Sequence, residues 1–354
     1  MRVLYFGTYE RRYPRNAQVI SALRRAGVDV TEQHESVWEG SDENWSAGPA
    51  TALRLARAEL RLLRRTPPEA DALIVGYPGQ FDLPAARRAA KGRPIVFNPL
   101  VSLSDTFVAD RGRFRPGSLA ARVLTAIDRR ALRAADLVVA DTQADADFFA
   151  QLADLPQERL AVCLVGAEER FFRPGWTPEE PFTAVFVGKL IPLHGLQTIL
   201  EAARLAPDLR LRIIGHGQLD RLVEARPPNV EWTRWVEYER LPTELHRAGC
   251  ALGIFGTSDK ARRVIPNKAF QALACGVPLI TADTPAAREL LTHEQSALLI
   301  PPGDAQALAA AIRQLASDPD LSRRVADGGL AVYRERAGED VLGAQWRSLL
   351  ERLL

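Results

Sequence analysis

The sequence is poor in the residues that build disulfide or metal frameworks. It has three cysteines among 354 residues, and these are Cys163, Cys250 and Cys275. Disulfide-dense domains and structural zinc sites both need more closely spaced cysteines. An odd number at wide spacing therefore predicts buried thiols in a reducing compartment, with neither a disulfide framework nor a metal site.

Long apolar runs and a strong charge are also lacking. No stretch approaches the ~18 apolar residues of a membrane span, and the N-terminal MRVLYFG passes directly into a strand pattern without a secretory signal. The formal net charge is only +2, which provides no bulk attraction for nucleic acid. We expect a cytoplasmic protein that does not bind nucleic acid.

Lysine is scarce as well. The 46 Lys and Arg residues include only four lysines, namely Lys91, Lys189, Lys260 and Lys268. This bias toward arginine is typical of a GC-rich bacterial genome. In a sequence whose cations are almost all arginine, a lysine indicates a position where function favours that residue. Three of the four lie in the segments 186–195 and 259–276.

Strand and helix patterns alternate along the whole chain. Short apolar runs that end in glycine or a polar turn, typical of buried parallel strands, start at Arg2–Gly7 and start again at Thr183–Val187 after a segment rich in proline and charge. This predicts an α/β protein of two Rossmann-like, doubly wound domains whose parallel sheets face each other across a cleft. The predicted parts are an N-terminal domain (1–170), a linker (171–181), a C-terminal domain (182–335) and a C-terminal helix that packs back toward the first domain (336–354).

Two segments of the second half carry an anion-binding pattern. In FVGKLIPLHG (186–195) an apolar strand is followed by Gly188 and Lys189, and the next strand ends at Gly215. Glycines at the carboxyl ends of parallel strands let a ligand approach the backbone, and helix N-termini nearby attract phosphate. In DKARRVIPNKAFQALACG (259–276) the apolar stripe predicts a helix that begins near Asn267, with Lys268 in its first turn. The alternative for this second segment is a solvated basic loop before an ordinary helix.

Five motifs, in this order and spacing, resemble the C-terminal half of the retaining glycosyltransferases of family 4. They are VGKLIPLHGLQTILEAARL, LRIIGHGQ, LPTELHRAGCALGIFG, NKAFQALACGVPLITADTPAARELL and ALLIPPGDAQALAAAI. The resemblance covers roughly residues 160–316, and the N-terminal half matches only in its organisation. It implies the GT-B architecture, with the acceptor on the side of the first domain and a nucleotide sugar bound by the second.

The resemblance also implies roles for individual residues. Lys189 matches an arginine that contacts the donor diphosphate, beside Gly188, and Glu289 matches an acidic residue after the next strand. His194 stands where the family has a second cation. The paired glutamates of the family, which bracket seven residues, are replaced by Arg263 and Gln271. Gln271 can still hydrogen-bond a ribose hydroxyl, whereas Arg263 must serve a phosphate or a charged donor sugar.

The first half offers weaker candidates. We expect the loop after the first strand, residues 7–16, to face the cleft, because ligands bind at the carboxyl ends of strands. Its Tyr9, Arg12, Arg15 and Asn16 would contact an anionic acceptor or the donor phosphates, and the alternative is a solvated turn. Asp105 is the candidate for orienting the acceptor hydroxyl.

The predicted activity is transfer of a sugar, with retained configuration, from a nucleotide sugar to an acceptor hydroxyl of a small molecule, glycan or lipid-linked saccharide. Lys189 and Lys268 would stabilise the leaving diphosphate, with no cofactor and no essential metal. Two alternatives are a nucleotide-sugar epimerase, hydrolase or pseudo-glycosyltransferase of the same architecture, and a non-catalytic nucleotide-sugar-binding protein. The amphipathic basic segment 52–65 is either a surface helix or a contact with the inner face of a membrane.

Overall fold

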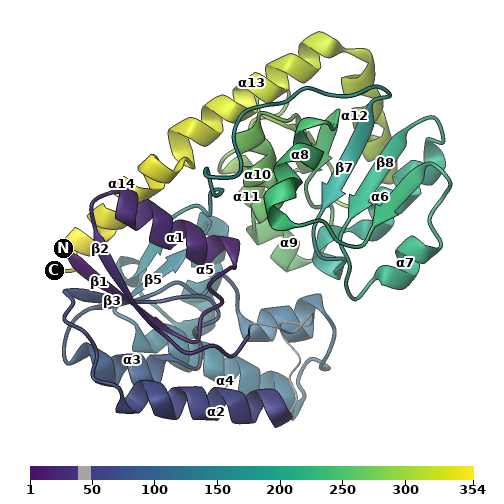
Figure 1. The fold of residues 1–354 in the computed structure, drawn as a ribbon. Helices are drawn as coiled ribbons and strands as arrows, with labels where there is room; N and C mark the ends of the chain where they lie inside the picture. Colours follow the sequence, from purple (N-terminus) through teal and green to yellow (C-terminus); the bar gives the residue numbers. More distant parts are fainter. Residues whose placement is uncertain (39–48) are drawn as a thin grey trace. The chain divides into compact units, whose positions relative to one another are not determined.

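The computed structural model describes residues 1–38 and 49–354. The chain divides into two units (Figure 1): unit 1 comprises Met1–Val165 and Glu339–Leu354, and unit 2 comprises Gly166–Gly338. Each unit contains one six-stranded sheet, and every strand pair is parallel. The α/β fold with two parallel sheets is therefore as predicted from the alternating pattern.

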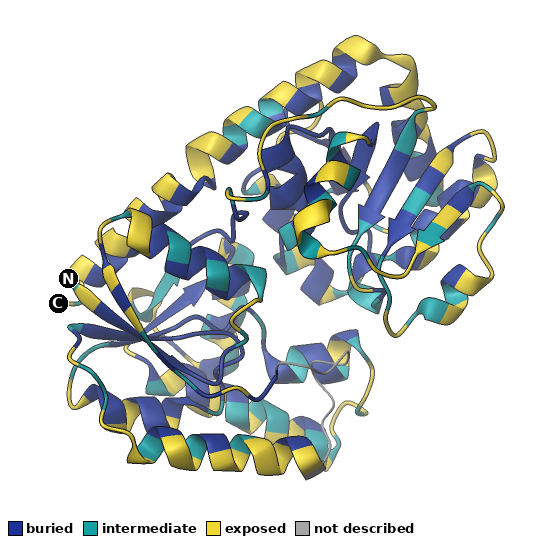
Figure 2. Ribbon diagram, in the orientation of Figure 1, coloured by how far each residue is buried: buried dark blue, intermediate teal, exposed yellow. Residues whose placement is uncertain are grey.

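The sheet of unit 1 has the order β2-β1-β3-β4-β5-β6. Its strands are β1 (Arg2–Gly7), β2 (Asp29–His34), β3 (Ala72–Val75), β4 (Ile95–Phe97), β5 (Leu137–Ala140) and β6 (Leu160–Val162). Its helices are α1 (Pro14–Arg25), α2 (Pro49–Arg64), α3 (Leu83–Ala90), a π-helix η1 (Asp105–Asp110), α4 (Leu119–Ala134), α5 (Gln143–Ala153), a short 3₁₀ turn η2 (Gln157–Arg159) and α14 (Glu339–Glu351). Strands β1, β3, β4 and β5 are almost entirely buried (Figure 2), which is why their sequences are apolar without alternation.

Helix α14 packs along α1, although 313 residues lie between Arg25 and Glu339 in the sequence. Gly343 allows this contact, because a Cβ there would overlap the carbonyl oxygen of Ala22. At the helix end, Arg25 forms ion pairs with Glu339 and Asp340.

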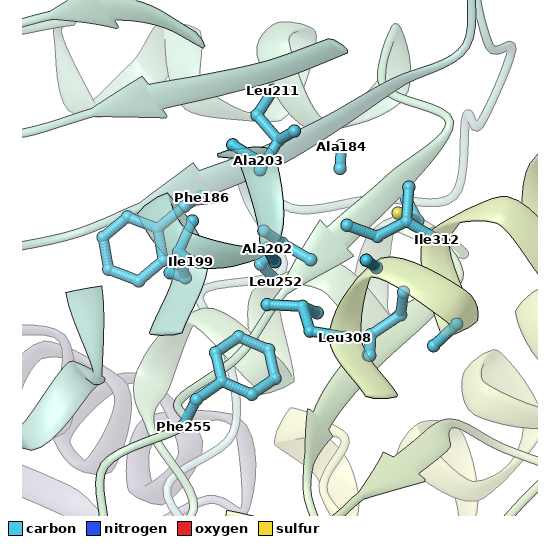
Figure 3. Packing of buried hydrophobic residues seen from close by; sticks show 14 of the residues in the cluster. Ala184, Phe186, Ile199, Ala202, Ala203, Leu211, Leu252, Phe255, Leu308 and Ile312 are labelled. Carbon is cyan, nitrogen blue, oxygen red and sulfur yellow. The ribbon is translucent and has the colours of Figure 1, made fainter. Parts of the chain in front are cut away.

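The sheet of unit 2 has the order β12-β11-β10-β7-β8-β9. Its strands are β7 (Thr183–Val187), β8 (Arg210–Ile214), β9 (Val230–Thr233), β10 (Cys250–Leu252), β11 (Leu279–Ala282) and β12 (Leu298–Ile300). Its helical segments are η3 (Pro192–His194), α6 (Leu196–Leu205), α7 (Asp220–Glu224), η4 (Tyr238–Arg240), α8 (Leu241–His246), α9 (Asp259–Arg263), α10 (Asn267–Cys275), α11 (Pro285–Arg288), α12 (Ala305–Ser317) and α13 (Pro319–Arg336). Figure 3 shows the core between this sheet and helices α6 and α12, which includes Phe186, Ile199 and Leu308.

The segment 171–181, which we predicted as a linker, lies within unit 2. Backbone hydrogen bonds tie it to the ends of two helices, from Gly175 to Cys275 and from Thr177 to His246. The side chain of Trp176 adds a hydrogen bond to the carbonyl oxygen of Ala248. These bonds explain why a segment dense in proline and charge belongs to a compact unit.

Candidate functional site

The loop after β7 is shaped by Gly188. Its φ of 147° lies in a region that residues with a side chain rarely adopt. Lys189 follows and is exposed, while its carbonyl oxygen accepts a 2.5 Å hydrogen bond from Nδ1 of the buried His194. That bond assigns the proton to Nδ1 and fixes the imidazole beneath the loop. His194 thus holds the loop that carries Lys189, a role that the sequence did not indicate.

The ends of β7 and β8 pack closely against each other. A Cβ at Gly215 would overlap the carbonyl oxygen of Gly188, and a Cβ at Gly217 would lie 2.9 Å from the nitrogen of Leu190. The backbone nitrogen of Gly188 also donates to the carbonyl oxygen of Ile214. The ends of β7 and β8, which both lead into the glycines predicted from the sequence, therefore contact each other through backbone atoms alone.

Lys268 is the most unusual side chain of this region. It is 8% exposed, and its Nζ lies 3.8 Å from the centroid of the Phe186 ring. A Cβ on Gly188 would lie 2.8 Å from the same nitrogen. Within residues 1–38 and 49–354, Nζ has no hydrogen-bond partner. Burial lowers the pKa of Lys268 well below its ordinary value of 10.5.

Lys268 lies in the first turn of α10, so the partial positive charge of the helix N-terminus lies beside its ammonium. The helix starts at Asn267, and its N-cap, Pro266, makes no side-chain hydrogen bond to the helix. The first N–H groups of a helix lack intrahelical partners and carry partial positive charge. A buried ammonium, a helix N-terminus and half-buried glycine backbone together are suited to a phosphate group.

Gln271 lies one turn further along α10 and is also buried. Its Nε2 donates to the hydroxyl of Tyr238 at 3.3 Å. Lys268 and Gln271 are three residues apart on one helix, so their side chains share a face. The structure therefore brings together Gly188, Gly215, Lys268 and Gln271, four of the candidates from distant segments.

Arg263 and Glu289 lie at the ends of two short helices. Arg263 is the last residue of α9 and is half-buried, and Glu289 directly follows α11 and is half-buried. The carbonyl oxygen of Glu289 accepts a hydrogen bond from the guanidinium of Arg336. Their proposed contacts with a donor sugar stay predictions.

In unit 1, the prediction that residues 7–16 form one loop is wrong at its end. Helix α1 begins at Pro14, because proline fits the first helical position, where no N–H is needed. Arg15 and Asn16 are consequently helical and fully buried. Arg15 donates to Asn98 and to the carbonyl oxygens of Cys163 and Leu164, so its guanidinium is engaged in the interior of unit 1.

The other candidate residues of this segment differ in burial. The amide of Asn16 donates to the carbonyl oxygens of Glu10 and Tyr77, which ties two loops together. Tyr9 is buried, and its hydroxyl donates to Glu32 at 2.6 Å. Burial and then this carboxylate raise the pKa of Tyr9. Arg12 is exposed, and its contact with an acceptor stays a prediction.

Asp105 begins the π-helix η1 and is half-buried. Its backbone nitrogen donates to the hydroxyl of Ser102. The buried carboxylate of Asp128 accepts from the backbone nitrogens of Leu103 and Ser104 and so shapes the segment before it.

A pair of carboxyl groups near β1 was not predicted from the sequence. The buried Asp82 accepts from the backbone nitrogen and hydroxyl of Thr8, at 2.7 and 2.9 Å. Burial, together with the neighbouring carboxyl group of Asp82, raises the pKa of Glu59 of α2 to about 10. Asp82 directly precedes Leu83–Ala90, a position typical of an ordinary helix cap. No sequence signal distinguished the pair.

A hollow of about 510 Å³ lies at the opposite, amino ends of β7, β8 and β9. Its charged walls are paired, for example Arg212 with Glu231 and Glu244, and Arg247 with Glu179. Ligands of parallel α/β sheets bind at the carboxyl ends of the strands, so this hollow is not the candidate site.

Metal ligands do not gather anywhere in the part of the chain that the structure describes. Over residues 1–38 and 49–354, no group of three or more His, Cys, Asp or Glu side chains is arranged to hold a metal ion. None of the helices in these ranges has the length and apolar content needed to cross a bilayer.

Part of the chain is similar to known glycosyltransferases. Residues 167–330, which lie within unit 2, match the family profile "Glycosyl transferases group 1". The lipopolysaccharide core biosynthesis glycosyltransferase LpsD of Rhizobium meliloti is 28% identical over 182 residues, 50% of this chain and 51% of that protein. The putative colanic acid biosynthesis glycosyltransferase WcaL of Escherichia coli is 29% identical over 215 residues, 56% and 52% of the two chains. The chain spans about half the length of these curated relatives.

Solved structures establish the fold over the whole chain. A sucrose-phosphate synthase of Thermosynechococcus elongatus has a TM-score of 0.76 at 16% identity and covers 99% of this chain and 98% of its own. Anabaena HepE in complex with UDP and glucose has a TM-score of 0.69 at 17% identity and covers 99% of both chains. The fold is therefore GT-B. The profile match and these neighbours support a GT-B glycosyltransferase.

Proposed function

We propose that this chain is a glycosyltransferase that moves a sugar from a nucleotide-sugar donor to an acceptor hydroxyl with retention of configuration. The observation that carries the proposal is Lys268, a buried ammonium at a helix N-terminus and against Gly188, with no hydrogen-bond partner among the described residues. A diphosphate would supply the missing counter-charge. Anabaena HepE, whose fold this chain shares, is described in complex with UDP and with UDP-glucose.

In the proposed reaction, the bond between the donor sugar and its diphosphate breaks while the acceptor hydroxyl attacks from the same face. The departing diphosphate oxygen takes the acceptor proton, so no protein nucleophile is required. Lys268, Lys189 and the N-terminus of α10 stabilise the negative charge that develops on the phosphate. Gln271 binds the ribose, and Asp105 and Arg12 serve the acceptor. The reaction needs no cofactor and no essential metal.

Two steps test the activity. Thermal-shift measurements with UDP, GDP, ADP and CDP, each with and without EDTA, should find one nucleoside diphosphate that stabilises the protein. The matching nucleotide sugars are then incubated with candidate acceptors, and NMR of the product reports the anomeric configuration. If none of these nucleotides raises the unfolding temperature, the transferase proposal is refuted. Free sugar or an epimer as the sole product would indicate a hydrolase or an epimerase.

We further propose that unit 1 contacts an anionic membrane surface, where a lipid-linked acceptor would be found. Helix α2 exposes Leu53 and Leu60 (53% and 51%), and α4 exposes Leu119 and Val123 (76% and 48%). Both helices contact α3. The arginines of α2 are exposed, and its only acidic residue, Glu59, is half-buried. Exposed apolar side chains among cations favour the interface of a bilayer with acidic headgroups.

Co-sedimentation with vesicles of phosphatidylglycerol and phosphatidylcholine tests this contact. Arg57→Glu together with Arg64→Glu should lower vesicle binding at least about tenfold, since each basic residue contributes about 1 kcal/mol near such a surface. Arg334→Glu together with Arg352→Glu is the charge-matched control outside α2 and α4. Equal loss in both double variants would assign the effect to net charge rather than to α2.

A further inference from the structure

The backbone of His194 is fixed against the segment that follows β10. His194 ends η3, and its carbonyl oxygen accepts a hydrogen bond from the nitrogen of Phe255 at 3.1 Å. The next residue is Gly195, where a Cβ would overlap the carbonyl carbon of Phe255. Phe255 is fully buried in the core of unit 2. The His194 side chain therefore starts from a backbone position that the core holds in place.

The imidazole of His194 contacts two neighbours that lead to the two lysines of the candidate site. Its Nδ1 lies 2.5 Å from the carbonyl oxygen of Lys189. Its ring meets the ring of Phe186 edge-on, with centroids 5.6 Å apart and an interplanar angle of 64°. The Phe186 ring in turn carries Nζ of Lys268, 3.8 Å from its centroid. One side chain thus lies against both the loop of Lys189 and the aromatic ring that Lys268 contacts.

The imidazole and the ammonium also approach the same stretch of backbone. A Cβ built on Gly188 would lie 3.5 Å from Cε1 of His194 and 2.8 Å from Nζ of Lys268. His194 is 9% exposed and Lys268 is 8% exposed, so both groups are held among other atoms of unit 2. The two side chains therefore lie on either side of the glycine that precedes Lys189.

The hydrogen bond to Lys189 decides what a neutral imidazole can do at this position. A carbonyl oxygen only accepts, so Nδ1 of His194 carries the proton. In a neutral imidazole the other nitrogen, Nε2, is then an acceptor. Charged phosphate oxygens also only accept, so a neutral His194 has no further N–H to donate to a diphosphate. Its contacts suit it to hold neighbouring cations rather than to replace one.

We propose that His194 is a positioning residue that sets both cations of the proposed diphosphate site, Lys189 through the loop carbonyl and Lys268 through the ring of Phe186. This inference rests on the proposed function. A fixed loop limits the positions open to the Lys189 side chain. A fixed ring presents its face, the attractive side for a cation, to the Lys268 ammonium. Groups that are held in place before the substrate arrives lose less freedom on binding, which favours affinity.

The test separates the two contacts of the imidazole. His194→Phe keeps a ring against Phe186 but has no N–H for the loop, and His194→Asn keeps an N–H near the place of Nδ1 but has no ring. Calorimetry, with displacement titrations for weak ligands, measures Kd of UDP, GDP, ADP and CDP and of their nucleosides. For the best-binding base, the ratio of the nucleoside Kd to the diphosphate Kd reports the diphosphate contacts alone. Each variant should lower this ratio about 3- to 10-fold, the range for one contact of this kind.

Double variants assign each loss to one lysine. In the Lys189→Met background, His194→Phe should change the ratio by less than about twofold, whereas His194→Asn should still lower it. In the Lys268→Met background, this order should be reversed. A residue that acts through one group loses its effect when that group is removed. A His194 that bound phosphate directly would instead lower the ratio in both backgrounds.

His246→Phe is the matched control, because His246 of unit 2 also donates a ring N–H to a backbone carbonyl oxygen, that of Arg173, at 2.8 Å. Its replacement should leave the ratio within about twofold of the native value. An equal loss in His246→Phe and His194→Phe would assign the effect to a general change in unit 2 and would overturn the inference.

Each outcome supports or overturns the inference. Losses that persist in both lysine backgrounds overturn it, as does equal weakening of the nucleoside and the nucleoside diphosphate, which indicates a purely structural role. If no nucleoside diphosphate binds the native protein, the proposed function fails together with the inference. If one binds but the ratio never responds to His194, only the inference fails. Where His194→Phe does not fold, His194→Asn in the two lysine backgrounds still decides the contribution of the Phe186 contact.

Discussion

Replacement of Lys268 by methionine should stabilise the free protein and inactivate it. The ammonium is buried, lacks a hydrogen-bond partner among the residues that the structure describes, and has its pKa lowered by burial. Methionine fills a similar volume and makes favourable sulfur–aromatic contacts, here with Phe186. The substitution thus removes an unfavourable buried charge without opening a cavity.

The magnitude follows from opposing contributions. Leaving a charge in the interior without a partner costs several kcal/mol, whereas an ammonium over a desolvated aromatic ring recovers about 2 kcal/mol. We expect the free energy of unfolding to rise by about 1–3 kcal/mol in Lys268→Met, similar to other replacements of buried charge by apolar side chains. At about 2–4 °C per kcal/mol for a domain of this size, the unfolding transition should move up by roughly 2–12 °C.

The pH dependence has a definite sign. In the unfolded chain Lys268 titrates near 10.5, and in the folded chain at a lower pH. Between these two pKa values the unfolded state binds the extra proton, so the stability of the native protein rises with pH. The advantage of Lys268→Met should therefore be largest in acid and shrink as pH approaches 10.5.

Chemical denaturation at several pH values measures this effect, and Lys189→Met is the control. Lys189 is exposed, so its replacement should change the free energy of unfolding by less than about 0.5 kcal/mol. A nucleoside diphosphate at 100 times its Kd should add about 2.7 kcal/mol to the native protein and much less to Lys268→Met. If Lys268→Met is destabilised by more than about 1 kcal/mol, or turns over normally, the reasoning is refuted.

Further predictions concern the same loop and the carboxyl pair. Lys189→Ala should lower kcat at least about 100-fold with little change in stability, since one donor to developing charge is lost; an unchanged kcat would mean that the diphosphate lies elsewhere. Gly188→Ala should destabilise the protein by about 1–3 kcal/mol, because φ is 147° and the new Cβ would contact the Lys268 ammonium; thermal unfolding checks this, and an unchanged transition contradicts it. Glu59→Gln should raise stability at neutral pH, because the pKa of Glu59 is raised to about 10 in the native protein. The native protein therefore loses stability as pH rises from 4.5 toward 10. Parallel profiles of unfolding free energy against pH for the two proteins would disprove this prediction.

The parts of the site that follow from sheet geometry were predictable. The carboxyl ends of neighbouring parallel strands meet at one edge, so Gly188 and Gly215 could be placed together from their position after apolar runs. Lys268 followed from a helix start in the same half. The fold class was predictable for the same reason, because each βα step leaves its own apolar pattern.

The connections between side chains were not predictable. Gln271 donates a hydrogen bond to Tyr238 although the two residues are 33 positions apart in the sequence. Nothing local marks such partners, because their proximity depends on how the whole chain is folded. Arg15 illustrates the opposite error. Its charge suggested a ligand contact, but Pro14 starts the helix one residue earlier and Arg15 is buried, where it donates to two backbone carbonyl oxygens.

The packing of α14 on α1 has a consequence for biosynthesis. Unit 1 is assembled from the first and the last residues of the chain, and residues 166–338 are translated between them. At roughly 5–20 residues per second, the ribosome needs about 10–35 seconds for that interval. During this interval, the face of α1 that contacts Gly343 and Trp346 in the folded protein is exposed to solvent. The nascent first half is therefore an intermediate with an exposed apolar surface, a natural client for chaperones, while unit 2 has all of its own residues before unit 1 does.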